Sequence, residues 1–277
     1  MNLQKFKIVS DSSSDILTVP DVSFSSAPLK IITADKEYID DATLDVYAMA
    51  EELLRYKGKS STACPSPGDW IAAFGDAQYI FCVTITSGLS GSYNAACIAK
   101  QQYEENNPGK KVFVIDSLSA GPELCLIIEK LREYILSGKE FDEICTLIPQ
   151  YLSKTGLLFI LESMRNLANN GRVNPIVAKA AGLLGIRAVG RASSKGTLEL
   201  LEKCRGEQKA FSSILRHLGD NIKKVRIAHC NNESAVAQLS SLIAEKFKDA
   251  EIKIYQLRGL CSFYAEKGGL LVGYETI

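Results

Sequence analysis

Short apolar runs, each followed by a polar turn and a helical stretch, recur in the first half of this 277-residue chain. The runs are residues 6–9, 79–85 and 111–115, and the turns after them are residues 10–15, 86–92 and 116–122. After the third turn, apolar residues such as Leu124, Ile127 and Leu131 recur every three or four positions, which predicts an amphipathic helix. Repeated strand–turn–helix units are typical of a parallel sheet covered by helices.

Smaller elements are predicted between these units. Residues 27–38 alternate weakly and indicate one or two strands, and an acidic stretch at 40–45 leads into a helix that contains Met49 and Leu53. The hydroxyl-rich stretch 60–67 contains two prolines, which fix φ and predict an irregular, stiff loop. A further helix is expected to begin at Asp69.

From residue 156 onwards the repeated unit disappears, and strands and helices follow in a mixed order. The expected elements are a strand at 157–161, a short helix at 164–167 ended by Gly171, a helical stretch at 179–184, strands at 186–191 and 197–201, a helix at 208–218, a strand at 225–229, a helix at 236–247, and strands at 251–257 and 270–274. We therefore expect an α/β protein of two closely packed domains. Residues 1–155 would form an α/β/α domain on a parallel sheet, and residues 156–277 an α+β domain.

Composition places the chain among ordinary globular proteins, since 46% of its residues are hydrophobic and 23% are charged. No apolar run approaches the roughly 20 residues of a membrane-spanning helix. The first residues form no signal-peptide core, so we expect a cytoplasmic protein.

Charge is balanced overall but unevenly spread. Residues 1–155 carry 14 Lys and Arg against 21 Asp and Glu, whereas residues 156–277 carry 18 against 11. The basic residues are dispersed and lack interleaved aromatics, which argues against a nucleic-acid partner. A docking face for an acidic partner and an ordinary solvated surface both fit this pattern.

Cysteine and histidine usage gives little support for metal or redox chemistry. The eight cysteines lie at least 15 positions apart and mostly in apolar patterns, so we expect small buried side chains rather than disulfides or zinc ligands. The sequence contains two histidines, His217 and His229. We therefore expect no metal site, no cofactor and no histidine-dependent catalytic triad.

The turn after the second strand carries the strongest candidate chemistry. It reads Ser87-Gly-Leu-Ser-Gly-Ser92, so hydroxyls and unencumbered backbone amides meet at the start of a helix. Free N–H groups and the helix dipole favour negative charge there, which predicts an anion site. A serine-rich helix cap without a ligand is the alternative.

Six motifs resemble, in the same order, those of DegV-family proteins. They are Asp11-Ser-Ser-Ser-Asp15, Thr62-x-x-Pro-Ser66, Ser87-Gly-Leu-Ser-Gly-Ser-Tyr93, Asp116-Ser-x-Ser-x-Gly121, Asn170-Gly-Arg172, and the series Ile186-Arg187, Gly196 and Lys203-x-Arg205. Together they span nearly the whole chain. One such motif would be weak evidence, whereas six in order are strong evidence.

The resemblance implies a two-domain DegV-like fold with a long-chain fatty acid buried between the domains. It also implies that a separate fatty acid kinase subunit phosphorylates the bound acid, so that this chain is a carrier and not an enzyme. Transient contact with a membrane is compatible with that role.

Residue by residue, the resemblance assigns the carboxylate to Thr62 and to the turn Ser90, Gly91 and Ser92, with Arg172 in the surrounding polar network. It also makes Arg187, Lys203 and Arg205 candidates for docking the kinase.

The chain departs from the family pattern near its C-terminus. The family usually has His-Thr-Gly-Pro-Gly there, and this sequence has Tyr264-Ala-Glu-Lys-Gly268. Tyr264 can still donate a hydrogen bond to the ligand but is not cationic near neutral pH. Ala188 and Cys64 replace a proline and a glutamine of the family pattern.

Two other functions stay open from the residues alone. Ser90 lies in Gly88-Leu-Ser-Gly-Ser92, which partly matches the Gly-x-Ser-x-Gly nucleophile elbow of lipid hydrolases and acyltransferases, although its second glycine comes one position early. The same anion turns could also hold a phosphorylated metabolite or another anionic amphiphile.

Overall fold

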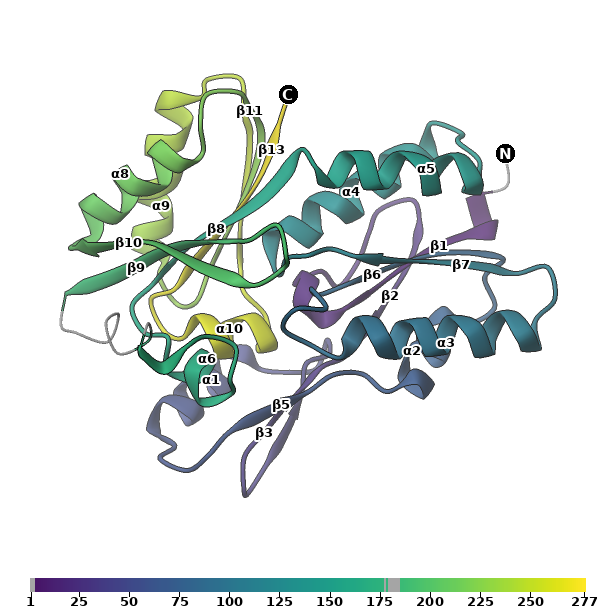
Figure 1. Ribbon diagram of the computed structural model, residues 1–277, viewed down its shortest axis with the longest axis horizontal. Helices are drawn as coiled ribbons and strands as arrows, with labels where there is room; N and C mark the ends of the chain where they lie inside the picture. Colours follow the sequence, from purple (N-terminus) through teal and green to yellow (C-terminus); the bar gives the residue numbers. More distant parts are fainter. Residues whose placement is uncertain (1–2, 177, 179–184) are drawn as a thin grey trace.

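The computed structural model describes residues 3–176, 178 and 185–277, and the helical stretch expected at 179–184 lies outside them. An N-terminal region contains a parallel sheet, and a C-terminal region contains a separate, larger sheet (Figure 1). The expected α/β fold class is therefore confirmed. The division into two domains at residue 155 stays a prediction.

Four parallel strands form the N-terminal sheet in the order β2-β1-β6-β7. They are β1 (Phe6–Asp11), β2 (Ser23–Ala27), β6 (Tyr79–Thr84) and β7 (Lys111–Asp116). Helices α2 (Pro67–Phe74) and α3 (Ser92–Asn106) cover one face, and α4 (Pro122–Leu136) and α5 (Phe141–Leu152) the other (Figure 1). Because the strands are parallel, the polar turns after β1, β6 and β7 meet at one edge of the sheet.

The apolar stripe predicted for α4 is the side that packs on this sheet. Leu124, Ile127 and Leu131 are fully buried against Phe81 and Val83 of β6. Pro122 begins the helix, where its missing N–H costs no intrahelical bond. The 3.6-residue period therefore identified the side that packs on this sheet, but the opposite side of α4 is buried too, since Leu126 is fully buried and the helix also packs against β13.

A small antiparallel sheet with the order β4-β3-β5 lies beside the N-terminal sheet. It consists of β3 (Lys30–Ile32), β4 (Glu37–Ile39) and β5 (Ser61–Ala63), with α1 (Val46–Arg55) between β4 and β5. The expectation of an irregular loop across 60–67 is thus wrong for its first residues, because Thr62 pairs with Ile31 in the sheet. Pro65 and Pro67 lie beyond the strand and end it.

Six strands form the C-terminal sheet in the order β10-β9-β8-β13-β11-β12. They are β8 (Thr155–Leu161), β9 (Ile186–Ala192), β10 (Leu198–Arg205), β11 (Ile222–His229), β12 (Glu251–Gln256) and β13 (Leu270–Thr276). Helices α8 (Glu207–His217) and α9 (Glu233–Lys246) cover one face of it (Figure 1). The other face turns towards the N-terminal region.

Two short helices lie between the sheets, α6 (Arg165–Asn169) and α10 (Gly259–Ala265). The sequence did not predict α10, because six of its seven residues are buried and no polar face marks a helical period. Two 3₁₀ helices complete the described elements, η1 (Leu3–Lys5) and η2 (Ser12–Ser14). Asp15 ends η2 in a left-handed conformation, with φ of 60°.

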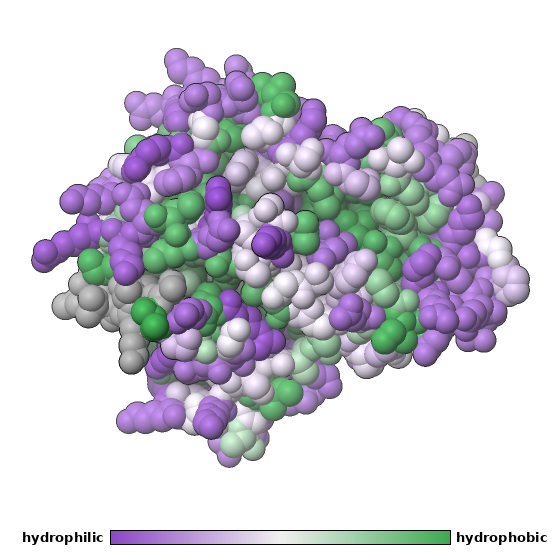
Figure 2. All heavy atoms as spheres, viewed as in Figure 1, coloured by the Kyte–Doolittle hydropathy of each residue, from purple (hydrophilic) through white to green (hydrophobic). Residues whose placement is uncertain are grey.

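Hydrophilic residues surround most of the outline of the molecule, and hydrophobic residues gather nearer the centre of the face in Figure 2. No helix in the described part of the chain is long and apolar enough to cross a membrane. Five of the eight cysteines are buried, and the other three are half-buried.

The turn between β9 and β10 joins the two regions through a close backbone approach. Thr86 Oγ1 of the N-terminal region donates a hydrogen bond to the carbonyl of Gly196 at 2.8 Å. Gly196 has φ of 72°, and a methyl group there would overlap the Thr86 hydroxyl. Glycine is required at this position for both reasons.

Gly196→Ala is expected to lower the free energy of unfolding by about 2 kcal/mol, because the methyl group overlaps Thr86 and the left-handed conformation becomes strained. Gly171→Ala is the matched control, since Gly171 has φ of 73° with no atom within 4 Å of the added carbon. It should cost about 1 kcal/mol. Urea unfolding of both variants measures the difference, and equal losses would show that the contact with Thr86 contributes nothing.

Candidate functional site

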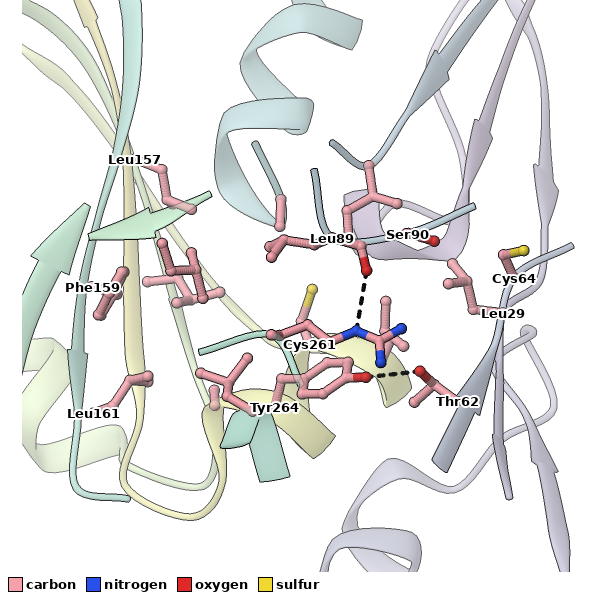
Figure 3. A pocket seen from close by; sticks show the side chains of 18 of the residues that line it. Leu29, Thr62, Cys64, Leu89, Ser90, Leu157, Phe159, Leu161, Cys261 and Tyr264 are labelled. Carbon is pink, nitrogen blue, oxygen red and sulfur yellow. Dashed lines mark hydrogen bonds between the residues drawn. The ribbon is translucent and has the colours of Figure 1, made fainter. Parts of the chain in front are cut away.

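A cavity of about 320 Å³ lies between the carboxyl edge of the N-terminal sheet and the C-terminal sheet (Figure 3). Its lining comes from both regions and is mostly apolar. The polar side chains that line it are Thr62, Ser90, Arg172 and Tyr264. Their grouping decides what the cavity can hold.

The polar side chains of Thr62 and Tyr264 meet at one end of the cavity. Thr62 Oγ1 of β5 and Tyr264 Oη of α10 share a hydrogen bond of 2.7 Å, and Figure 3 shows the two side chains pointing towards each other. Burial raises the pKa of the Tyr264 hydroxyl above its usual value, although the bond to Thr62 opposes the shift. Tyr264 therefore stays protonated at neutral pH and can donate a hydrogen bond.

Arg172 supplies the positive charge of the lining. Its Nε donates to the carbonyl of Leu89 at 3.1 Å, and its Nη1 donates to the carbonyl of Asn170. These two bonds hold the guanidinium beside the turn that precedes α3. In the part of the chain that the structure describes, Arg172 makes no ion pair, so its charge is available to an anion in the cavity.

Asp11 holds that turn in place through hydrogen bonds. Its Oδ2 accepts bonds from the amide of Ile85 at 2.9 Å and from Ser92 Oγ at 2.6 Å. Asp11 is fully buried, and burial raises the pKa of its carboxyl while the hydrogen bonds partly offset that shift. The carboxylate at the end of β1 thus fixes the turn that carries Ser90 and Gly91.

The opposite side of the cavity is apolar and belongs to β8. Leu157, Phe159 and Leu161 alternate onto the cavity face of the sheet, across from Ser90, Cys64 and Thr62 in Figure 3. Leu158 and Ile160 point to the other face and join the core under α8 and α9. The period of two along a strand therefore divides one apolar run between core and cavity, which a continuous apolar sequence does not reveal.

Five of the six expected ligand-binding residues line this cavity, namely Thr62, Ser90, Gly91, Arg172 and Tyr264. Ser92 does not line it, because its hydroxyl donates to Asp11 and its side chain is fully buried. That all six bind a ligand stays a prediction.

The three residues expected to dock a kinase do not share one face. Arg187 pairs with Cys204 across β9 and β10, so it lies on the face covered by α8, where it contacts Glu162 at 2.8 Å and Glu207 at 3.8 Å. Lys203 and Arg205 alternate with Cys204 and therefore point to the other face, at the edge strand of the sheet. Docking through all three residues stays a prediction.

Sequence reasoning identified the polar end of the site but not its apolar wall. Leu260 and Cys261 of α10 line the cavity together with Leu198, Leu271 and the β8 residues. The hydroxyl turn and Thr62 stood out because serine, threonine and glycine interrupt apolar patterns. Cavity-lining leucines look like core residues in sequence and carry no separate signal.

Chemically, the arrangement suits an amphiphile with an anionic head. The hydroxyls of Thr62 and Tyr264, the turn at Ser90 and the guanidinium of Arg172 are grouped together within a lining that is otherwise mostly apolar. Of the described residues, no histidine lines the cavity, and the hydroxyl of Ser90 accepts a bond from the amide of Ser92 at 3.2 Å. No group of three His, Cys, Asp or Glu residues within the described ranges is placed to hold a metal ion.

Known proteins resemble this chain along its whole length. A family model described as an uncharacterised protein of the DegV family matches residues 5–276. A DegV domain-containing protein of Streptococcus pneumoniae is 46% identical over 277 residues, covering 98% of this chain and 99% of that protein.

Two solved structures superpose closely on this fold. The Streptococcus pneumoniae Fatty Acid Kinase (Fak) B3 protein, loaded with linoleic acid, has a TM-score of 0.96 and 46% identity, covering 99% of this chain and 100% of its own. A DegV family protein of Eubacterium eligens, loaded with heptadecanoic acid, has a TM-score of 0.95 and 43% identity, covering 98% of this chain and 100% of its own.

Proposed function

Because the chain belongs to the DegV family, we propose that it binds a long-chain fatty acid in this cavity and presents the acid to a fatty acid kinase. The observation that carries the proposal is the composition of the cavity lining, in which the polar side chains of Thr62, Arg172 and Tyr264 occur among mostly apolar ones. Two similar proteins that are 43% and 46% identical to this chain hold fatty acids, which supports the same ligand class here.

The carboxylate would accept hydrogen bonds from Thr62, Tyr264 and the amides of the Ser90–Ser92 turn, with Arg172 balancing its charge. Burial of the acyl chain would contribute about 0.8 kcal/mol per methylene before the entropy cost of binding. Even a few polar contacts then suffice for tight binding, because the summed contribution of the acyl methylenes outweighs that of one headgroup. The acyl chain would lie along β8, between the two proposed domains at 1–155 and 156–277.

The kinase would carry out the phosphoryl transfer, and this chain would act as the carrier in the cytoplasm. Lys203 and Arg205 form the proposed docking face, with Arg187 behind them. Exchange of the acid would bring the protein into transient contact with a membrane.

Mass spectrometry of a solvent extract from the denatured protein tests the ligand. We expect a fatty acid in about equimolar amount, and a rise in melting temperature when oleate or palmitate is added to stripped protein. Recovery of a phosphorylated amphiphile would instead show that the natural ligand is not a fatty acid. Recovery of nothing, with no thermal shift, would refute lipid binding. Formation of ADP from ATP by a fatty acid kinase subunit, only when loaded carrier is added, tests the second half of the proposal.

Thr62→Val keeps the shape of the side chain and removes the hydroxyl, so the affinity for oleate is expected to fall about 5- to 10-fold. Displacement of a fluorescent fatty acid measures the change. Methyl oleate is the control ligand, because its neutral ester carbonyl is a weaker acceptor than a carboxylate and should lose less affinity than oleate does. An equal loss for acid and ester would mean that Thr62 shapes the cavity and does not contact the headgroup.

A further inference from the structure

Two buried carboxylates of the N-terminal region hold the start of α10. Asp40 accepts the amide of Gly259 with Oδ1 at 2.9 Å and the amide of Leu260 with Oδ2 at 2.8 Å. Asp15 Oδ1 accepts the preceding amide, that of Arg258, at 2.7 Å. Three successive backbone N–H groups are therefore bound by two side chains that lie more than 200 positions away in sequence.

Helix α10 is one wall of the cavity. Its residues Leu260, Cys261 and Tyr264 all line it, and Tyr264 lies one helical turn after Leu260. Cys261 Sγ also donates to the carbonyl of Ser13, within the segment that joins Asp11 to Asp15. The hydrogen bonds at the start of this short helix therefore help to place Tyr264 opposite Thr62.

We propose that Asp40 and Asp15 are positioning residues of the ligand site, which hold α10 so that Tyr264 faces the headgroup, and that ionisation of Asp15 loosens this hold. The proposal deepens the proposed function and rests on it for the identity of the ligand. It also gives a role to Asp15, the second aspartate of the Asp11–Asp15 motif, which is not among the residues that line the cavity.

The two aspartates have different roles. Both oxygens of Asp40 accept amide hydrogens, and these bonds oppose the burial that raises the pKa of its carboxyl. Asp15 Oδ2 is buried and has no hydrogen-bond partner in the described structure, so a charge there gains little. Burial raises the pKa of Asp15 well above its usual value, and the charge of Asp40 adds to the shift, while the Arg258 amide, the Cys261 thiol and the Arg258 charge oppose it.

The ionisable groups around the pair come from every element packed against it. They are Asp11 of β1, Asp41 beside Asp40, Arg258 directly before α10, Cys261 of α10, Cys125 of α4, Cys230 after β11 and Tyr255 of β12. Burial raises the pKa values of these cysteines and of Tyr255, so they stay neutral between pH 5.5 and pH 8.5. Burial also raises the pKa values of Asp11, Asp15 and Asp40, whereas hydrogen bonds from Thr43 lower that of Asp41.

The sign of the pH effect follows from the direction of the shift. A solvated Asp15, with α10 released, has the ordinary pKa of about 3.9. In the closed state the pKa is higher, so the closed state binds more protons than the open state between the two values. Raising the pH through the native pKa of Asp15 therefore favours the open state, and ligand exchange should become faster.

Asp15→Asn isolates this effect. The amide oxygen can keep the bond from Arg258, and the amide nitrogen takes the place of the unpartnered Oδ2. We expect release of a fluorescent fatty acid from the wild type to speed up about tenfold from pH 5.5 to pH 8.5, and release from Asp15→Asn to stay slow throughout. Dodecanesulfonate, which does not titrate, is displaced in parallel to exclude the ligand's own carboxyl group as the cause.

Asp40→Asn should act in the opposite direction, because its amide nitrogen must face a backbone N–H. The affinity for oleate is expected to fall about tenfold. Tyr264→Phe should lower the affinity for oleate about fivefold in the wild type but less than twofold in the Asp40→Asn background. A misplaced Tyr264 contributes little to binding, so removal of its hydroxyl has a small effect there. Fully additive losses would overturn the positioning role of Asp40.

Hydrogen exchange of the ligand-free protein separates this proposal from the proposed function. The amides of residues 258–260 should exchange faster at high pH, beyond the intrinsic rate, in the wild type and not in Asp15→Asn. Asp69→Asn, which alters a capping carboxylate of α2, is the matched control and should leave these amides unchanged. If the wild type binds no fatty acid, the proposed function fails; if it binds but neither release nor exchange depends on Asp15, this proposal fails.

Discussion

Replacement of Arg226 by methionine is expected to lower the free energy of unfolding by about 3–4 kcal/mol. Arg226 of β11 is 1% exposed and makes two bonds to Glu129 of α4, Nε to Oε1 at 3.0 Å and Nη2 to Oε2 at 2.6 Å. Its Nη2 also contacts Glu251 Oε1 of β12 at 2.9 Å. Methionine fills a similar length but leaves the Glu129 carboxylate without its main partner between the two regions.

Matched variants separate the buried charge pair from lost packing. Lys253→Met removes an exposed cation from the same Glu129 and Glu251 and should cost less than about 1 kcal/mol. Arg226→Met combined with Glu129→Met should be more stable than Arg226→Met alone, because no unpaired carboxylate stays behind. Urea unfolding gives all three values. If the double variant is the less stable one, packing and not charge explains the loss.

The contacts between the two regions bear on how a ligand can enter and leave the cavity. The bonds between Arg226 and Glu129 join α4 to the C-terminal sheet, while Thr86 and Gly196 join the two regions at a second place. With the regions fastened at both places, a short element such as α10 is better placed than a whole region to open a path for the ligand. The looser hold by Asp15 fits that picture.

Local chemistry made part of this structure predictable. The parallel sheet followed from repeated strand–turn–helix units. The turn that lines the cavity at Ser90 and Gly91 followed from Ser87-Gly-Leu-Ser-Gly-Ser92, because hydroxyl and glycine residues there interrupt the apolar pattern between a strand and a helix. Thr62 and Tyr264 were expected through the family resemblance. Their direct contact was not, since 202 positions separate them.

The features that the sequence did not predict were hidden for physical reasons. Six of the seven residues of α10 are buried, so the helix has no amphipathic period, and β5 is only three residues long and lies beside two prolines. Arg226 reads as one more polar residue in a strand, because its partner lies 97 positions away on α4. Pairing across the fold, and not local pattern, decides these features.

Arg172→Met should have the largest effect on ligand choice. Hydrogen bonds to charged groups contribute about 1.5–3 kcal/mol, so the affinity for oleate is expected to fall about 10- to 100-fold. Methyl oleate and oleyl alcohol have no charge to lose and should bind nearly as before. Displacement of a fluorescent fatty acid, at low and at moderate salt, measures each affinity.

Arg165→Met is the matched control, because this nearby arginine is 58% exposed and does not line the cavity. Arg172→Lys should recover only part of the loss, since a lysine cannot keep the Nε bond to Leu89 that aims the guanidinium. Equal losses for acid, ester and alcohol would mean that Arg172 supports the turn at Leu89 and does not read the carboxylate. A selective loss for the acid would instead locate the headgroup beside Arg172, and the acyl chain would then extend towards β8.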